Sequence, residues 1–202
     1  MKKWLRNPLI LRILKKYTEV FAFPIRLSVL ENRLVAYLGD TKKLLDLGSS
    51  NGKLVSLLAK KQSFEVIGVD THILPETFIE IKKYDGRKLP FPNNSFDTVL
   101  IVDVLHHDED PAKILQEAKR VAKKQIIIKD HFWQNKIDFL WLKIADFTGN
   151  IPYGVACPYN YLTLEKWDQL FGSLSLTKVR SERFRFLPLD PCRHVIFALS
   201  VN

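Results

Sequence analysis

The sequence predicts one α/β domain, in which mostly parallel strands alternate with helices on both faces of the sheet. A short apolar strand, a glycine-bounded turn and leucines at helical spacing follow one another over residues 44–58. Further apolar runs end in acidic residues, as expected of buried parallel strands. The 202 residues suffice for one such core and are too few for two ordinary ones, so we expect a single domain over 1–202.

The first 40 residues predict a helical cover for this domain. Residues 8–23 carry apolar side chains on one helical stripe, which predicts an amphipathic helix. Pro24 is expected to break it, and a second helix is expected over 26–37. Two interpretations stay open for the helix: weak contact with an anionic membrane, or packing on the sheet with its basic side in water, which is commoner. Residues 1–36 hold two acidic side chains and eight basic ones: Lys2, Lys3, Arg6, Arg12, Lys15, Lys16, Arg26 and Arg33.

The turn from Gly48 to Gly52 predicts a site for a small ligand, because glycines let the backbone approach a ligand closely. The free N–H groups at the start of the following helix add hydrogen-bond donors. A P-loop would need one more residue between the glycines, and a hydroxyl where Leu54 stands, which excludes a nucleotide triphosphatase. A dinucleotide fingerprint would have glycine in place of Ser50 and Lys53, so that interpretation comes second.

The same stretch resembles the first motif of class I methyltransferases, D-x-G-x-G-x-G, which binds S-adenosylmethionine (SAM). Asp46, Gly48 and Gly52 match the motif, while Ser50 stands at the position of its middle glycine. Serine is small enough to leave room for the methionine part of SAM. The resemblance implies a Rossmann-like sheet whose last strand is antiparallel, with SAM as the cofactor.

A second strand over 64–70 ends at Asp70, which lies 18 residues beyond Gly52. An acid near this separation accepts hydrogen bonds from ribose hydroxyls in fingerprint nucleoside sites, because the adjacent strand ends beside the first. A single aspartate at a strand end is often only a turn former, but the glycine turn and the spacing together favour the ribose role.

The second crossover is expected to be shortened. Only residues 71–78, with Pro75 among them, separate Asp70 from the next expected strand over 79–85, which leaves little room for a helix. The crossover helix is therefore expected to be reduced to a turn, and this edge of the sheet to be distorted or open.

Residues 84–97 resemble the segment that UbiE-like methyltransferases of the type 11 group carry around the adenine, with LPFPNNSFD as the recognisable core. Asp85 could accept the adenine amino group, while a backbone amide near Gly86 or Arg87 reaches a ring nitrogen. The resemblance covers about residues 42–130. It implies a set of cofactor-binding residues: Asp46, Gly48, Ser50, Gly52, Asp70, Asp85, Gly86, Arg87 and Asp103, the last of these at the end of the strand expected over 98–103.

The rest of the chain continues the alternation of helices and strands. Helices are expected over 111–122, around 139–147 and after a cap at Thr163. Strands are expected over 125–129, 175–180 and 194–201. That order suits the class I methyltransferase ending, in which the last strand inserts antiparallel.

His107 and His131 are the candidate catalytic bases. Each follows the end of one of two adjacent parallel strands, at the edge where open α/β sheets bind ligands. Methyl transfer is an in-line displacement, so a base is needed only where the acceptor must lose a proton. Asp130 could orient His131 or bind the acceptor itself.

Residues 131–172 are the expected substrate lid, because the segment is longer than ordinary connections and follows the fifth strand. Two tyrosines and two asparagines supply flat apolar area with donors and acceptors. Packing of the tyrosines against the core is an equally open interpretation. The expected acceptor contacts are Asn150, Tyr159, Asn160 and Tyr161.

These observations favour a SAM-dependent methyltransferase that acts on a small-molecule or lipid-like acceptor. The fourth strand does not lead into the Pro-Pro-aromatic motif of enzymes that methylate amino groups of nucleic-acid bases, and Pro191-Cys192 lies far from the position used for cytosine C5. A net charge of +9 leaves an RNA methyltransferase open, without a specific nucleic-acid motif. A non-catalytic scaffold that kept the fold is the competing class.

No metal is predicted, because Cys157 and Cys192 form no metal-ligand pattern. Their number and spacing favour a reduced, cytoplasmic setting over a disulfide framework. Apolar runs are too short to span a bilayer, and basic residues interrupt the one that would resemble an export signal. Peripheral contact with a membrane through the first helix stays open.

Overall fold

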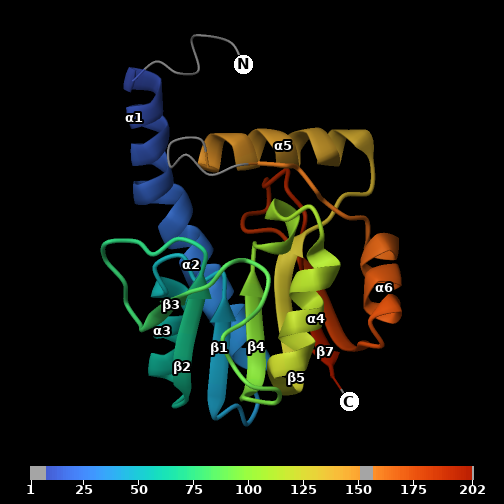
Figure 1. Ribbon diagram of the computed structural model, residues 1–202. Helices are drawn as coiled ribbons and strands as arrows, with labels where there is room; N and C mark the ends of the chain where they lie inside the picture. The colour runs from blue at the N-terminus through green and yellow to red at the C-terminus, as the bar shows by residue number, and fades with distance from the viewer. Residues whose placement is uncertain (1–7, 151–156, 202) are drawn as a thin grey trace.

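The computed structural model describes residues 8–150 and 157–201. Seven strands form one sheet in the order β3-β2-β1-β4-β5-β7-β6. All pairings from β3 to β5 are parallel, and β7 is antiparallel to both β5 and β6 (Figure 1). The expected Rossmann-like sheet with an antiparallel last strand is therefore confirmed. Its strands are β1 Lys43–Leu47, β2 Glu65–Asp70, β3 Ile81–Lys83, β4 Phe96–Val102, β5 Ala122–His131, β6 Thr177–Phe184 and β7 His194–Ser200.

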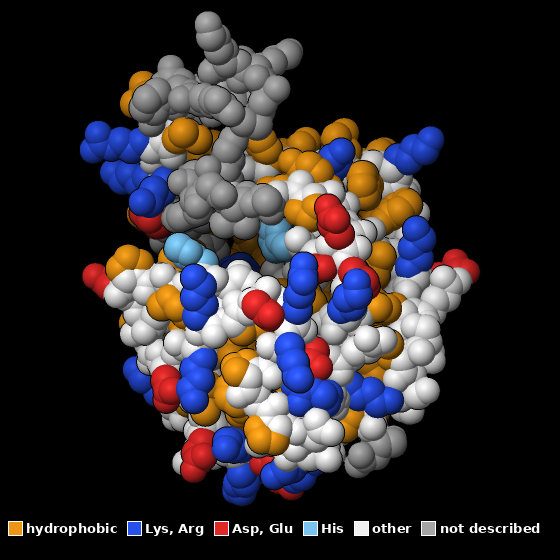
Figure 2. Space-filling view, in the orientation of Figure 1, with side chains coloured by type: hydrophobic (Ala, Val, Ile, Leu, Met, Phe, Trp, Pro, Cys, Tyr) orange, Lys and Arg blue, Asp and Glu red, His pale blue; other side chains and the backbone are white. Residues whose placement is uncertain are grey.

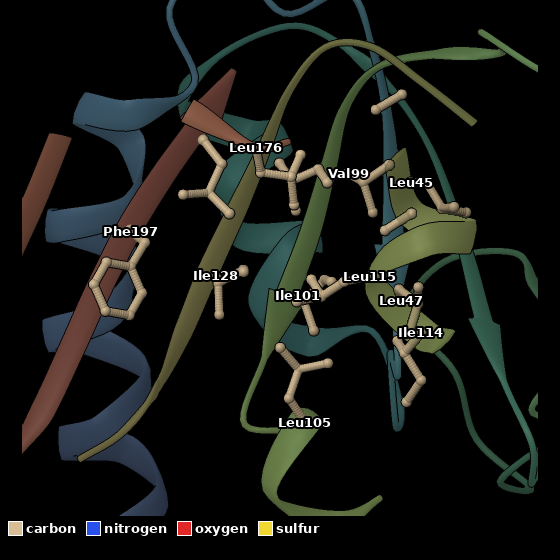
Figure 3. Packing of buried hydrophobic residues seen from close by; sticks show 14 of the residues in the cluster. Leu45, Leu47, Val99, Ile101, Leu105, Ile114, Leu115, Ile128, Leu176 and Phe197 are labelled. Atoms are coloured by element: carbon tan, nitrogen blue, oxygen red, sulfur yellow. The ribbon is translucent and has the colours of Figure 1, made fainter. Parts of the chain in front are cut away.

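Helices cover both faces of the sheet, as the sequence predicted. Two hydrophobic clusters, one on each face, fill the space between sheet and helices because the central strands are buried on both sides. Figure 3 shows side chains of the first cluster, with Leu115 of α4 among residues of β1, β4 and β5. Trp167 of α6 belongs to the same cluster, and Leu30 of α2 and Val55 of α3 to the other. The helices are α1 Pro8–Tyr17, α2 Phe23–Leu34, α3 Lys53–Lys61, α4 Pro111–Val121, α5 Lys136–Asn150 and α6 Leu164–Ser173.

The expectation that Pro24 breaks the first helix is wrong. The chain continues in helical conformation from α1 through a π-helical turn, Thr18–Ala22, into α2. Phe23 donates its N–H to the carbonyl of Thr18, five residues back, so the wider turn absorbs the proline that follows. Pro24 then lies in the first turn of α2, where its missing N–H costs little. Lys2, Lys3 and Arg6, which the charge argument included, lie outside the described residues.

The shortened second crossover is confirmed. Residues 71–80 between β2 and β3 contain no helix, and β3 is a strand of only three residues at the edge of the sheet. The strand expected over 79–85 is therefore shorter than predicted, and Asp85 lies two residues beyond its end.

The carboxyl ends of the parallel strands form one edge of the sheet, and α5 lies across it (Figure 1). Beneath α5, a third and smaller cluster contains Leu142, Tyr161 and Cys192. The free thiol of Cys192 is buried there. Among the described residues, no helix is both long and apolar enough to cross a membrane.

Candidate functional site

The turn after β1 folds as a cradle of residues with positive φ. Gly48 has φ +77°, Ser50 +53° and Gly52 +72°. The left-handed conformation favours glycine, which explains why a glycine is usual at the position of Ser50. Gly48 donates its N–H to the Val69 carbonyl over 2.8 Å, which ties the turn to the end of β2.

Two of these glycines are also required by crowding. A Cβ on Gly48 would overlap the side chain of Val104, and one on Gly52 would overlap Ile79. The backbone of the turn therefore packs directly against the segments that follow β2 and β4. This close approach leaves the outward side of the turn for a ligand.

Asp70 stands at the end of β2 beside the turn, as its spacing predicted. One carboxylate oxygen accepts the N–H of Ser50 over 2.8 Å, and the other accepts the N–H of His72 over 3.0 Å. An ionised carboxylate offers about four acceptor positions, so two remain for hydroxyl donors. Asp70 can therefore shape the turn and still bind a ribose.

Asp85 lies in the turn after β3 and accepts two backbone N–H groups. Arg87 donates over 2.8 Å and Lys88 over 2.9 Å, both to Oδ1, and these bonds lower the pKa of the Asp85 carboxyl. Gly86, between Asp85 and Arg87, has φ +79°. The arrangement keeps an exposed, ionised carboxylate at the end of the loop that resembles an adenine-binding segment.

Asp46 is buried at the end of β1. Burial raises the pKa of its carboxyl to about 7, with Asp70 adding to the rise. A cationic ligand group placed beside Asp46 would favour the ionised form, because opposite charges stabilise each other in a poorly solvated site.

Asp103, the acid at the end of β4, binds two cations that sequence analysis did not connect with it. Lys129 of β5 donates to Oδ1 over 2.6 Å, and Arg26 of α2 donates to Oδ2 over 2.6 Å. Burial opposes the charge of Asp103, but Lys129 and Arg26 outweigh it and hold its pKa well below the usual range. The only sequence signal was a lysine inside an apolar strand, and it did not reveal a partner.

His106 is the central residue of the polar cluster, and sequence analysis missed it in favour of its neighbour. Its Nδ1 lies 2.6 Å from Asp130 Oδ1, and its Nε2 lies 3.8 Å from Asp146 Oδ1. Burial opposes protonation, yet Asp130 outweighs it, with Asp146 adding to the effect, and raises the pKa of His106 to about 10. His106 is therefore an imidazolium at neutral pH and cannot act as a base there.

His107 and His131, the predicted bases, lie on either side of His106. The ring centroid of His107 is 4.2 Å from that of His106, and the centroid of His131 is 4.9 Å from it. Burial lowers the pKa of His131, and the charge of Lys129 lowers it further, so this imidazole is neutral near pH 7. Its Nδ1 lies 3.4 Å from an oxygen of Asp103 and 3.4 Å from one of Asp130.

Asp130 lies fully buried beneath the histidines. Burial raises the pKa of a carboxyl, but the charge and hydrogen bond of His106, together with His131, hold the pKa of Asp130 below its usual range. Its Oδ1 also accepts the backbone N–H of His131 over 2.7 Å. Asp130 therefore holds the His106 side chain and the backbone at His131.

The four predicted acceptor contacts all interact with other residues of the chain, three of them through side-chain hydrogen bonds. Asn150 donates to the Asp146 carbonyl over 3.0 Å, and Asn160 donates to the Asp108 carbonyl over 2.8 Å. Tyr161 is buried and donates its hydroxyl to the Leu142 carbonyl over 3.3 Å. Tyr159 is half-buried, with the Lys143 ammonium 4.8 Å from its ring centroid. The hydrogen bonds of Asn160 and Tyr161 tie the 157–172 segment to Asp108 and to Leu142 of α5. Packing is therefore part of the role of these two residues.

Two sets of side chains bring ligand atoms within 4.8 Å of one another: Asp103, His106, Asp130 and His131, and, separately, His106, His107 and Asp146. The first set includes the protonated His106, and its Asp103 already binds the ammonium group of Lys129. A metal ion there would have to displace a proton and compete with an ammonium group. The charges present favour a proton-holding network over a metal centre.

Surface hollows lie elsewhere as well. One of about 430 Å³ is lined by Asn93, Lys119 and Arg120, and one of about 410 Å³ by Pro111, Lys166 and Leu170, among others. Neither is lined by a residue that the sequence analysis predicted to be catalytic or to contact the cofactor or the acceptor. The site is therefore assigned from the strand ends and their polar side chains.

Comparison with known proteins connects the chain with methyltransferases. The model of the family described as "Methyltransferase domain" matches residues 45–128, which run from β1 into β5 and include the cradle, Asp70, Asp85 and Asp103. A demethylmenaquinone methyltransferase from Thermotoga maritima is 26% identical over 169 residues, covering 74% of each chain.

A shorter match links the chain to a phosphatidylethanolamine N-methyltransferase from Cereibacter sphaeroides, 32% identical over 59 residues. It covers 28% of this chain and 29% of that one, so less than a third of this relative is spanned. Among solved structures, the PH0226 protein of Pyrococcus horikoshii superposes with a TM-score of 0.69 at 21% identity and covers 99% of both chains. That likeness shows a shared fold.

Proposed function

We propose that this chain, which belongs to the class I SAM-dependent methyltransferases, methylates a small-molecule or lipid-like acceptor held between the carboxyl edge of the sheet and α5. The observation that carries the proposal is the order of the central strands. β1 leads into the glycine cradle, its neighbour β4 leads to His107, and β5 beside β4 ends at His131. Cofactor and acceptor sites thus adjoin at one edge.

The residues at this edge of the sheet are suited to binding SAM. Gly48 and Ser50 leave the outward side of the turn open, Asp70 keeps acceptor positions for the ribose, and Asp85 keeps a carboxylate for the adenine amino group. Asp46 would interact with the positive charge of the methionine part. When bound, SAM supplies a methyl group on sulfur that is activated for in-line displacement.

His131 is the base that this geometry supports best. Its imidazole is neutral near pH 7, whereas His106 between two aspartates is protonated. An acceptor hydroxyl or ammonium group would pass its proton to His131, and Asp103 and Asp130 would stabilise the resulting imidazolium. His107, half-buried on the other side of His106, is placed to position the acceptor.

A lipid-like acceptor is favoured by the side chains around the histidines. Tyr161 has its ring centroid 5.3 Å from that of His106, and the rings of Trp133 and Phe139 lie against each other at 5.4 Å. Aromatic rings with few polar atoms suit a flat or oily molecule whose reacting atom alone is polar. The expected lid, residues 131–172, includes 151–156, which lie outside the described residues.

The test is formation of S-adenosylhomocysteine from SAM with three kinds of acceptor: phosphatidylethanolamine vesicles, a demethylated quinol and bulk tRNA. We expect turnover with a lipid-like or small acceptor. His131→Gln should lower kcat by about 10²–10⁴-fold while SAM affinity stays unchanged. Turnover on tRNA alone would contradict the acceptor class, and tight SAM binding without turnover on any of the three would favour the scaffold.

A further inference from the structure

Helix α5 exposes an apolar stripe on its outer side, in addition to the Leu142 side chain that it buries. Ile137, Leu140, Trp141 and Ile144 are 43 to 67% exposed, and their spacing places them on one stripe of the helix. Asp138, by contrast, is buried on the inner side, where its carboxylate accepts from Arg193 over 2.8 Å. The outer side of a surface helix ordinarily carries polar and charged residues, so the exposed stripe of α5 is unusual.

The first helix presents a second exposed apolar stripe. Five side chains of α1 and the π-helical turn are 52 to 64% exposed: Leu9, Ile13, Tyr17, Val20 and Phe21. The rings of Tyr17 and Phe21 lie together, with centroids 6.1 Å apart. Residues of α1 contact residues of α5, so the two stripes belong to neighbouring elements.

Basic side chains surround these stripes. Arg12, Lys15 and Lys16 are exposed on α1, and Lys136 is exposed at the start of α5. Figure 2 shows hydrophobic side chains along the upper side of the molecule, where α5 lies in Figure 1, with lysine or arginine side chains close by. Glu19 of the π-helical turn is an acid beside this stripe, and its carboxylate lies 3.9 Å from the Lys15 ammonium group.

We propose that these nine apolar residues form a docking surface, here called the α1–α5 surface, that inserts into the headgroup region of an anionic lipid bilayer. Apolar side chains on one helix side with lysine and arginine beside them are the features of helices that lie in a membrane interface. The basic residues match the negative charge of such a membrane, which a neutral protein partner would not require. The proposal makes the first helix one part of a larger surface whose centre is α5.

The position of α5 connects this surface with the candidate site. Asp146 of α5 lies 3.8 Å from His106 and 3.9 Å from His107, while Ile144 of the same helix is exposed. The thickness of one helix therefore separates the histidines from the bilayer. This link rests on the proposed function, since it explains how a lipid-like acceptor could reach the site without crossing water.

The test is co-sedimentation of the full chain with phosphatidylcholine vesicles that contain or lack phosphatidylglycerol. We expect binding only to the anionic vesicles, and weaker binding as salt rises. The double variant Leu140→Gln with Ile144→Gln should weaken binding by about tenfold or more, because it removes two inserted side chains and keeps helix-forming residues. Brominated lipid should quench Trp141, so the quenching of the protein's tryptophan fluorescence should decrease in Trp141→Phe.

Val179→Gln is the matched control. Val179 is 70% exposed on edge strand β6, away from both helices, so its loss should leave vesicle binding unchanged. Equal binding by the parent and the double variant would overturn the proposal, as would no binding to anionic vesicles at low salt. A dimer that the double variant dissociates, together with no vesicle binding, would assign the surface to a second copy of the chain. SAM affinity should be the same in the parent and in all variants, and no SAM binding by the parent would contradict the proposed function without bearing on docking.

Discussion

Arg26 and Asp103, 77 residues apart in the chain, form a 2.6 Å ion pair that fastens α2 to the carboxyl end of β4. The Arg26 side chain is 33% exposed and that of Asp103 is 14% exposed, so water screens the pair only in part. Because Lys129 binds the other oxygen of Asp103, the acid joins the N-terminal helices to two neighbouring strands of the sheet.

Replacing Arg26 by Ala should lower the free energy of unfolding by about 1–3 kcal/mol, because a partly buried charge loses a hydrogen-bond partner. Lys15→Ala is the control, since the Lys15–Glu19 pair has side chains 52% and 53% exposed. Loss of that pair should cost about 0.5 kcal/mol or less. Urea unfolding measures both variants, and equal costs would show that the Arg26 pair is no stronger than a surface pair.

Replacing Asp70 by Ala should weaken SAM binding by about 1–3 kcal/mol, because the ribose loses its acceptor. Glu65→Ala is the matched control, since Glu65 is an exposed acid at the opposite end of the same strand. Calorimetric titration with SAM should separate the two variants. Unchanged affinity in a folded Asp70→Ala protein would remove Asp70 from the cofactor site.

Ser50 and Gly48 should respond in opposite directions to substitution. Ser50→Gly releases a serine from φ +53° and should leave the protein within about 1 kcal/mol of the parent, on the stabilising side. Gly48→Ala adds a Cβ at φ +77° against Val104 and should cost about 2 kcal/mol or more. Thermal unfolding measures both, and a destabilised Ser50→Gly variant would mean that the serine side chain has a role of its own.

The stability of the protein should fall as alkali deprotonates His106. The pKa of His106 rises from 6.5 to about 10 on folding, so its contribution is complete below pH 6.5 and is lost as the pH rises through about 10. His106→Ala leaves Asp130 buried without its counter-charge and should cost about 3–5 kcal/mol near neutral pH. Unfolding free energies measured from pH 6 to 10 should decline in the parent and stay flatter in the variant.

Asn160→Ala and Tyr161→Phe test whether the segment beneath α5 positions the acceptor. Each change removes mainly a polar group, so SAM binding should persist while turnover falls. Asn160 holds the Asp108 carbonyl and Tyr161 the Leu142 carbonyl, so a loss of about 1 kcal/mol of stability from each is expected as well. Turnover at the parent rate would assign these two residues to packing alone.

Features with a local cause could be predicted from the sequence. The positions of Gly48 and Gly52 follow from backbone geometry at one turn, and the end of β2 at Asp70 follows from an apolar run that stops. The missing crossover helix followed from the number of residues available before β3. In each case the decisive interactions lie within a few residues of one another.

Features that depend on long-range contacts could not be predicted in this way. The sequence does not distinguish the protonation of His106 from that of its neighbour His107. His106 is protonated because Asp130 and Asp146 lie beside it in the fold. The pairing of Asp103 with Arg26 depends on how α2 crosses the sheet. Pro24 was misread because a π-helical turn before it is not visible as a residue pattern.

The position of β7 determines when this protein can finish folding as it is synthesised. Among the described strands, β6 pairs only with β7, and β7 lies between β6 and β5. β6 therefore cannot join the sheet before β7 has been made. Chains grow from the amino end and their early segments begin to fold first. The parallel strands from β3 to β5 can therefore pair early in translation, while β6 waits until β7, which carries His194, has been made.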